Sequence, residues 1–135
     1  MQRRIYNRRK GATLIEFALV LLPLLAIVFG SFEMDRMLLI YTSVANSARA
    51  GVRYAIVHGH YNPPGEGDVE KVVRNFASMG LLDTTKVTVT VTYEDGTDHI
   101  GSPVSVSVAY LYDPFTSFFP LNATLRSTAK GTIAF

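Results

Sequence analysis

Hydrophobic residues along this chain fall into three successive patterns. Residues 12–32 form an apolar run whose only ionisable side chain is Glu16. From Met37 to His58, apolar residues recur at spacings of three and four, which is typical of a helix with one apolar face. From residue 86 onward the period becomes two, which is typical of strands. The sequence therefore predicts an α+β protein in which a long N-terminal helix precedes a short antiparallel sheet.

The apolar run has the length of a membrane span. As a helix, residues 12–32 would extend roughly 31 Å, close to the ~30 Å hydrocarbon core of a bilayer. The run is apolar on all sides, unlike a helix that lies on a surface. Pro23 should kink or loosen it near its middle, which a membrane helix tolerates. We expect residues 12–32 to cross a membrane and Glu33, Asp35 and Arg36 to mark its far boundary.

The positive charge of the chain lies at its N-terminus. The formal net charge is +2, but residues 1–11 hold five bases and no acid, while the rest holds eight bases and all 11 acids, a formal charge of −3. The positive-inside rule predicts a cytoplasmic N-terminus, with residues 33–135 as an extracytoplasmic domain. Because no basic patch extends over that domain, the sequence does not favour nucleic-acid binding.

A secretory signal peptide shares the basic start and apolar core of this segment. The apolar run is longer than the ~7–15 residues of a signal-peptide core. Its nearest approach to a cleavage site of small residues is Gly30-Ser31, which bulky Phe32 follows directly. These features favour an anchor over a signal peptide.

Glu16 is the unusual residue of the apolar run. A carboxylate at the centre of a bilayer costs about 2.5–3.5 kcal/mol, and less near the edge. On one reading, Glu16 is interfacial and its carboxylate reaches the headgroups. On the other, cleavage between Gly11 and Ala12 creates an α-amine about 6 Å away along the helix, which supplies the missing cation. Position alone does not separate these readings.

The helix after the span should pack one face against the outer domain. The opposite side is polar, so we expect this helix to leave the membrane and support the domain. The predicted apolar face comprises Met37, Leu38, Tyr41, Val44, Ala45, Ala48, Val52 and Ala55, and the polar side Arg36, Ser43, Asn46, Ser47, Arg49 and Arg53.

Residues 58–67 are rich in glycine and proline and should form a loop. A short helix should follow, with Asp68 as its N-cap and Gly80 at its end. Its apolar face would comprise Val69, Val72, Val73 and Phe76. His58 and His60 lack a nearby carboxylate cluster, so we expect no metal site in this loop.

Two segments alternate strictly between apolar and polar residues, 87–93 and 104–112. The Asp95-Gly96 turn signal between them predicts an antiparallel hairpin with one face against a helix. A third strand, 122–135, alternates less cleanly. Three acids surround the turn, but they lack the ligand spacing of a calcium loop, so ordinary turn chemistry is favoured. These acids are Glu94, Asp95 and Asp98.

Three phenylalanines lie in the proline-bounded segment 113–121, namely Phe115, Phe118 and Phe119. A loop seldom leaves so much apolar surface uncovered. The side chains could fold back over the core, or they could contact a membrane surface or another subunit. The sequence leaves both readings open.

Catalytic chemistry has little support in the sequence. The chain has no cysteine, which excludes disulfides, thiol catalysis and cysteine-ligated metals. It also has no glycine-rich phosphate loop and no His-Glu-x-x-His pattern. We therefore expect neither an enzyme nor a bound cofactor.

The stretch Arg8-Arg9-Lys10-Gly11-Ala12-Thr13-Leu14-Ile15-Glu16-Phe17 resembles the cleavage motif of type IV prepilins. Further similarity narrows this to the TadE-like proteins, pseudopilins of the tight adherence (Tad) pilus systems of bacteria. That similarity lies in the stretches Leu21-Leu22-Pro23, Phe29-Gly30 and Asn46-Ser47-Ala48-Arg49-Ala50-Gly51-Val52-Arg53-Tyr54-Ala55. The resemblance covers residues 8–57 well and the rest only in outline.

The resemblance implies cleavage after Gly11 by a membrane prepilin peptidase, with this chain as substrate. It implies that Glu16 and Phe17 lie at a subunit interface, where the Glu16 carboxylate faces the N-terminal ammonium of a neighbouring pilin-like subunit. The mature chain would begin at Ala12, reside in the inner membrane and join a surface pilus or its assembly machinery. The alternative is a single-pass anchored extracytoplasmic binding domain that is never processed.

Overall fold

The computed structural model describes residues 3–58, 66–96, 99–115 and 122–134. The order of elements is a long helix, a short helix, a single 3₁₀ turn and three strands. The chain divides into two compact units, Met1–Arg36 and Met37–Phe135. The long helix α1, Arg3–His58, contributes residues to both units. The predicted α+β class is confirmed.

Unit 1 contains only the first part of α1. The helix begins at Arg3, so its start precedes the apolar run and includes much of the basic leader. Helical structure continues through Pro23. Every residue from Gly11 to Val20 is exposed within the structure.

Unit 2 contains an antiparallel sheet in the order β1-β2-β3. Its strands are β1 (Val87–Tyr93), β2 (Pro103–Tyr112) and β3 (Ala123–Thr132). The two segments with strict alternation form the predicted hairpin, in which Val89 pairs with Val108. The turn lies where the Asp95-Gly96 signal predicted it, with Gly96 at φ 64° and its N–H donating to Tyr93 O at 3.0 Å. The third strand is also present, although shorter than the predicted 122–135.

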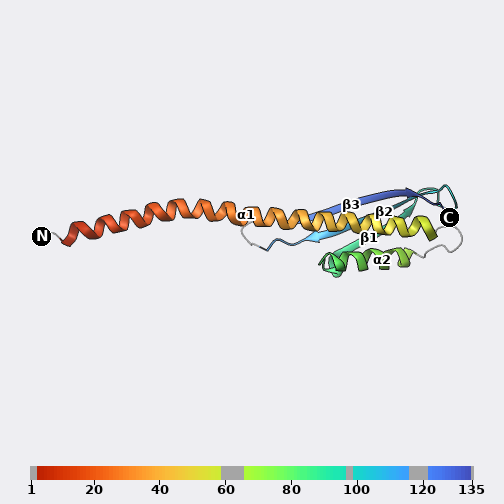
Figure 1. Cartoon of the computed structure of the whole chain (residues 1–135), viewed down its shortest axis with the longest axis horizontal. Coiled ribbons are helices and arrows are strands. Elements are labelled where there is room, and N and C mark those ends of the chain that lie inside the picture. The colour runs from red at the N-terminus through yellow and green to blue at the C-terminus, as the bar shows by residue number, and fades with distance from the viewer. Residues whose placement is uncertain (1–2, 59–65, 97–98, 116–121, 135) are drawn as a thin grey trace. The chain divides into compact units, whose positions relative to one another are not determined.

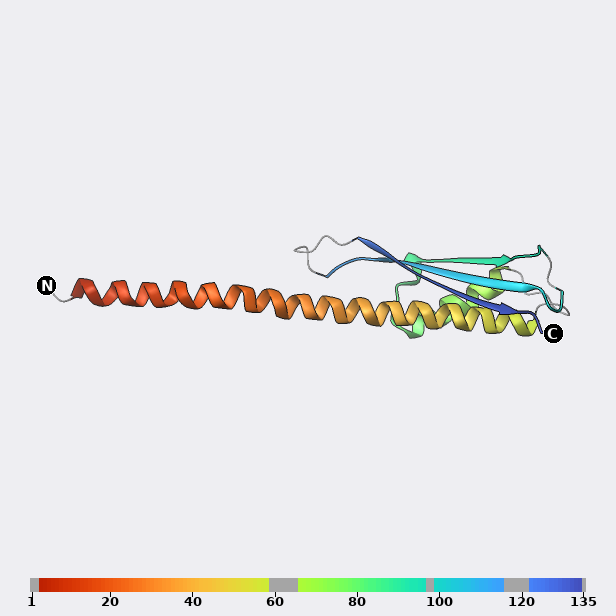
Figure 2. The ribbon, with the colours of Figure 1, turned by 90° about the horizontal axis from the view of Figure 1, so that it is seen from above.

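The core of unit 2 lies between the inner face of the sheet and two helices. Figures 1 and 2 show that the α1 segment of this unit runs alongside the strands, with α2 (Glu66–Met79) beside it. The fully buried side chains alternate along β2 and recur every three or four residues along the helices. They include Val44, Ala48, Ala55, Val69, Val73, Ala77, Val106 and Val108.

The predicted apolar face of α1 is correct at Met37 and from Val44 onward, but not between them. Leu38 and Tyr41 were expected in the core, but they are 62% and 45% exposed. Ser47 was expected on the polar side, yet it is fully buried. Its hydroxyl donates to the Ser43 carbonyl at 2.8 Å, so the helix itself satisfies this buried polar group.

Two glycines allow α1 and the sheet to approach each other closely. A Cβ built on Gly51 of α1 would lie 3.1 Å from Val106 Cγ1 of β2. Gly131 of β3 lies directly under Ile56 and Val52 of α1. The end of β3 is also tied to α1, because the Ala134 N–H donates to Ile56 O at 3.2 Å. The strand ends that hold Pro103 and Thr132 therefore lie at the Ile56 end of α1.

Helix α2 begins earlier than predicted, at Glu66, so Asp68 is not its N-cap. The expected loop 58–67 loses His58 to α1 and Glu66 and Gly67 to α2, and its remainder lies outside the described residues. The Asp68 carboxylate instead forms an ion pair with Lys71 at 2.9 Å, within the first turns of the helix.

Helix α2 ends at Met79, as Gly80 predicted. The Leu82 N–H donates to Ala77 O and the Leu81 N–H to Ser78 O, both at 3.1 Å, which is the Schellman pattern. In that pattern the left-handed position falls on Leu81, at φ 60°, and not on the glycine. The Leu81 side chain is 95% exposed.

The outer face of the sheet is polar and rich in hydroxyl groups. Thr90 of β1, Ser107 of β2 and Thr128 of β3 form one row across it, and Thr128 Oγ1 donates to Ser107 Oγ at 3.1 Å. Lys130 on the same face pairs with Glu94 at 2.5 Å. No helix of unit 2 covers this face in Figure 2.

Phe115 follows the end of β2 and is 86% exposed. The reading in which it folds back over the core is therefore wrong for this residue. Phe118 and Phe119 lie outside the described residues.

Candidate processing and assembly site

The residues that the sequence assigned to processing and assembly lie together near the start of α1. Gly11, Ala12, Glu16 and Phe17 fall within two turns of helix, and all four are exposed. Ala12 and Glu16 are four positions apart, which places them on the same side of the helix about 6 Å apart along its axis. An α-amine created at Ala12 would therefore start on the face that carries the Glu16 carboxylate.

Among the side chains that the structure describes, which begin at residue 11, none forms an ion pair with Glu16. Phe17, the next residue, is 63% exposed. A carboxylate in an apolar segment is expensive without a counter-charge. An α-amine at Ala12 would supply such a counter-charge on the same side of the helix.

Gly11 has no packing role in this structure. A Cβ built on it would meet nothing within 4 Å. The bond between Gly11 and Ala12 lies inside α1, where helical hydrogen bonding occupies the carbonyl of Gly11. A protease must open this turn to reach the bond, and glycine lowers that cost, since it stabilises a helix about 1 kcal/mol less than alanine.

The apolar segment that follows Glu16 has no buried residue within the structure, and most of its side chains are exposed. Among the described residues, one helix is long and apolar enough to cross a membrane, and none of its most apolar 18-residue window is buried. The core helix of a soluble protein would be mostly buried, so that explanation does not fit this segment. Its exposed large side chains include Leu19, Leu22, Ile27, Phe29 and Phe32.

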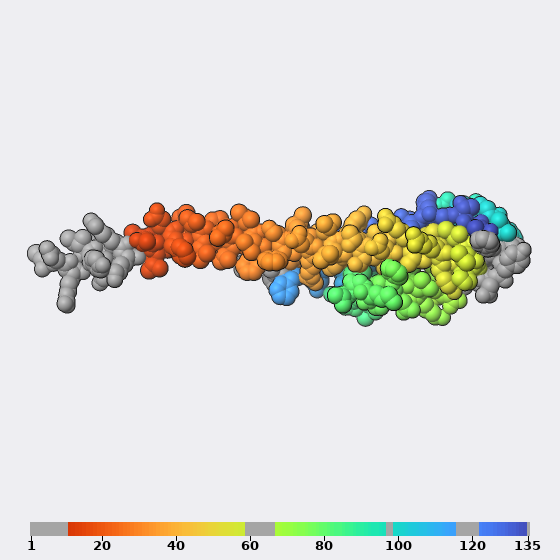
Figure 3. Space-filling view, in the orientation of Figure 1, coloured from red at the N-terminus to blue at the C-terminus, as the bar shows by residue number. Residues whose placement is uncertain are grey.

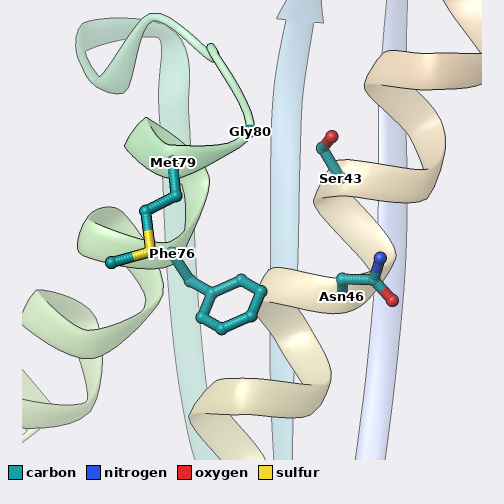
Figure 4. Close-up of a pocket in the computed structure, with 5 residues that line it drawn as sticks. All are labelled: Ser43, Asn46, Phe76, Met79 and Gly80. Carbon is teal, nitrogen blue, oxygen red and sulfur yellow. The ribbon is translucent and has the colours of Figure 1, made fainter.

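Sequence reasoning missed a small hollow between α1 and α2 of unit 2. It has a volume of about 220 Å³ and is lined by Ser43, Asn46, Phe76, Met79 and Gly80. Figure 4 shows the Phe76 ring reaching from α2 towards α1. Phe76 was predicted to lie on the apolar face of this helix, but it is 46% exposed because the buried stripe of α2 runs through Val69, Val73 and Ala77. In the space-filling view the two helices lie in direct contact here (Figure 3).

This hollow offers no acid–base chemistry, because its five lining residues include no titratable side chain. Gly80 lies close to Ser43 here, since a Cβ built on Gly80 would lie 2.9 Å from Ser43 Oγ. Asn46 and Ser43 supply the polar groups and Phe76 and Met79 the apolar ones. The only sequence signal for it was the helix end at Gly80.

The clusters that the sequence analysis discounted as metal sites have ordinary partners. The ring of His58 stacks on Tyr54 at a centroid distance of 4.2 Å, and its Nδ1 lies 3.0 Å from Tyr54 O. Glu94 is paired with Lys130. His60 and Asp98 lie outside the described residues.

Two comparisons with known proteins return nothing, since no curated protein and no solved structure matches the chain. The third concerns the segment that holds the candidate site. That segment, residues 11–53, matches the family model of the TadE-like proteins, in agreement with the resemblance of the motif around Gly11 and Glu16.

Proposed function

We propose that this protein is a pseudopilin-like subunit of a Tad pilus or a related secretion apparatus. The observation that carries the proposal is the combination at the start of α1. A family match over residues 11–53 coincides with an exposed apolar helix in which Gly11, Ala12 and Glu16 share two turns. The proposed role is structural, as expected of a pilus component.

In the proposed pathway, a prepilin peptidase of the inner membrane cleaves the bond after Gly11. Cleavage removes the five bases of residues 1–11, which hold the helix at the cytoplasmic leaflet. It also creates an ammonium group at Ala12, because α-amines titrate at about 7.7–8.0 and are mostly protonated at neutral pH. Loss of the leader eases extraction of the subunit into an assembly.

Glu16 then aligns subunits. Its carboxylate pairs with the Ala12 ammonium of a neighbouring copy or of a related subunit, in a bundle of apolar helices. Such a pair is strengthened by low dielectric and weakened by desolvation. The same amine lies one turn from Glu16 in its own chain, so the intermolecular pair competes with an intramolecular one.

Mass-spectrometric identification of the mature N-terminus in the native host tests the proposal. We expect a chain that begins at Ala12. An intact chain supports instead the alternative function, a permanently anchored extracytoplasmic binding domain, and a chain that begins elsewhere contradicts cleavage after Gly11. The same measurement on isolated pili would show whether the cleaved chain enters the filament.

A further inference from the structure

The end of unit 2 that holds Met37 carries exposed apolar side chains outside the predicted span. Leu38 and Leu39 of α1 are 62% and 68% exposed, and Phe115, just after β2, is 86% exposed. Met37 itself packs against the core. The exposed side chains therefore belong to a folded end of the unit.

One contact and the course of β2 along α1 place Phe115 at this end. Val106 of β2 lies against Gly51 of α1, and β2 runs alongside α1 in both ribbon views (Figures 1 and 2). The six residues from Val106 to Tyr112 span about 20 Å of strand. The fourteen residues from Gly51 back to Met37 span about 21 Å of helix. Tyr112 is thus level with Met37, and Phe115 follows three residues later.

The chain itself limits how far this end can lie from a membrane that holds residues 12–32. Only four residues separate Phe32 from Met37, so five Cα–Cα steps join the two. Even fully extended, these five steps cover at most about 18 Å. This limit holds for any orientation of the two units, because it depends on chain length alone.

The charges next to Phe115 are compatible with an apolar contact. Asp113, two residues before it, forms an ion pair with Lys86 at 3.3 Å. The pair reduces the net charge that this part of the surface presents to its surroundings. A surface that exposes an aromatic ring and leucine side chains favours the boundary between lipid headgroups and acyl chains.

We propose that the Met37 end of unit 2, which carries Leu38, Leu39 and Phe115, rests on the bilayer that anchors the chain, with the Phe115 ring among the lipid headgroups. This inference rests on the membrane anchor of the proposed function. The contact holds the subunit against the membrane before assembly. Because it is apolar, it does not require anionic lipid.

The sequence suits a direct test, because it contains no tryptophan. Full-length protein is reconstituted into vesicles of zwitterionic lipid as three single-tryptophan variants, Phe115→Trp, Leu22→Trp and Thr132→Trp. Leu22 marks the middle of the span. Thr132 is an exposed residue at the Ile56 end of the sheet and serves as the matched control. Circular dichroism checks that each variant keeps the fold.

Quenching by brominated lipids then reports the depth of each tryptophan. We expect the residue-115 variant to show blue-shifted emission and to lose more emission with bromines high on the acyl chain than with bromines near its end. The residue-22 variant should show the reverse order, and the residue-132 variant should show neither effect.

Three outcomes overturn the proposal and differ from one another. Quenching at residue 22 with water-like emission at residue 115 leaves the anchor intact and removes the surface contact. Blue-shifted emission at residue 115 that lipid bromines do not quench, and that reverts when protein is diluted in lipid, identifies a second copy as the covering partner. Absence of quenching at residue 22 removes the anchor and with it the proposed function.

Discussion

Gly51 of α1 lies directly against Val73 of α2, so that a Cβ at residue 51 would stand 2.5 Å from Val73 Cγ2. Val73 is fully buried and β-branched, and its side chain has little freedom to move away. Glycine at this position is therefore required by the packing of two helices, although it weakens α1 itself.

Gly51→Ala should destabilise unit 2 by about 1–2 kcal/mol. Overpacking a core costs typically 1–3 kcal/mol, and the higher helix propensity of alanine returns up to about 1 kcal/mol. Thermal or denaturant unfolding in detergent measures the change. Gly67→Ala in α2 is the matched control, since a Cβ there meets nothing within 4 Å, and it should leave stability unchanged or raise it. Equal effects at the two positions would contradict the packing argument.

Leu81→Gly should raise stability by roughly 1 kcal/mol. Leu81 occupies the left-handed position of the α2 C-terminus, which costs a residue with a Cβ about 1–2 kcal/mol. Its side chain is almost fully exposed, so little buried surface is lost. Leu81→Ala keeps the unfavourable φ and should show no such gain. A gain of the same size in both variants would attribute the effect to the side chain and not to the backbone.

Gly11→Val should leave most of the precursor uncut in the native host. The peptidase is expected to need a small residue at the cleavage position, and a Cβ at Gly11 disturbs nothing in the fold. Immunoblots that resolve the leader measure the cut fraction. Gly30→Val introduces the same side chain in the same helix, also with nothing within 4 Å, and should be processed normally. If both variants are cut, Gly11 is not the recognition residue.

Glu16→Gln should be cleaved normally but enter the assembly poorly. The amide keeps the shape of the side chain and removes the charge that pairs with the new ammonium. The ratio of this subunit in sheared pili to that in membranes gives the effect. Glu33→Gln removes a charge at the other end of the predicted span and should assemble as the native chain does. Normal assembly of the Glu16 variant would remove the ion pair from the mechanism.

Asp83 should give unit 2 a contribution to stability that depends on pH. Its carboxylate caps the 3₁₀ turn η1, Thr84–Lys86, and accepts from Thr85 Oγ1 at 2.6 Å and from Thr85 N at 3.0 Å. These hydrogen bonds hold the pKa of Asp83 below its ordinary value. The folded pKa is thus lower than the unfolded one, so the contribution is present above about pH 3.9 and is lost as the pH falls through the folded pKa.

Unfolding of the native chain and of Asp83→Asn from pH 7 to pH 2 measures this contribution. Other carboxylates titrate in both proteins and cancel in the difference. The stability difference between the two should shrink below about pH 3.9. A difference that stays constant with pH would show that the Asp83 charge does not stabilise the turn.

The spacing of apolar and polar residues predicted most of the helices and strands, because in most of them the apolar face is the buried one. The strict alternation of residues 87–93 gave the bounds of β1, since only one face of that strand meets a core. Leu38 and Tyr41 were placed wrongly because the spacing of apolar residues fits more than one stripe of this part of the helix, and the side chains that pack against the core here are Met37 and Ile40. Ser47 was misplaced because its hydroxyl is satisfied by its own helix, which a polarity pattern cannot reveal.

The candidate site divides in the same way. The motif of Gly11, Ala12 and Glu16 could be found in the sequence because its residues lie close together along the chain. The hollow lined by Ser43 and Phe76 depends on where α2 ends against α1, which is a tertiary relation. Leu81 was overlooked because glycine was the expected left-handed residue, and the structure places that conformation one residue later.

The row of hydroxyl side chains across the sheet forms part of the protein surface but contributes little to the stability of the fold. Thr90, Ser107 and Thr128 point away from the core, and replacement of such residues usually changes stability by less than about 0.5 kcal/mol. The opposite face of the same strands carries the buried valines, where a change of one methylene is felt. The protein can thus acquire new surface chemistry on this sheet through single mutations while its fold stays constant, which leaves the exterior free to diverge under selection.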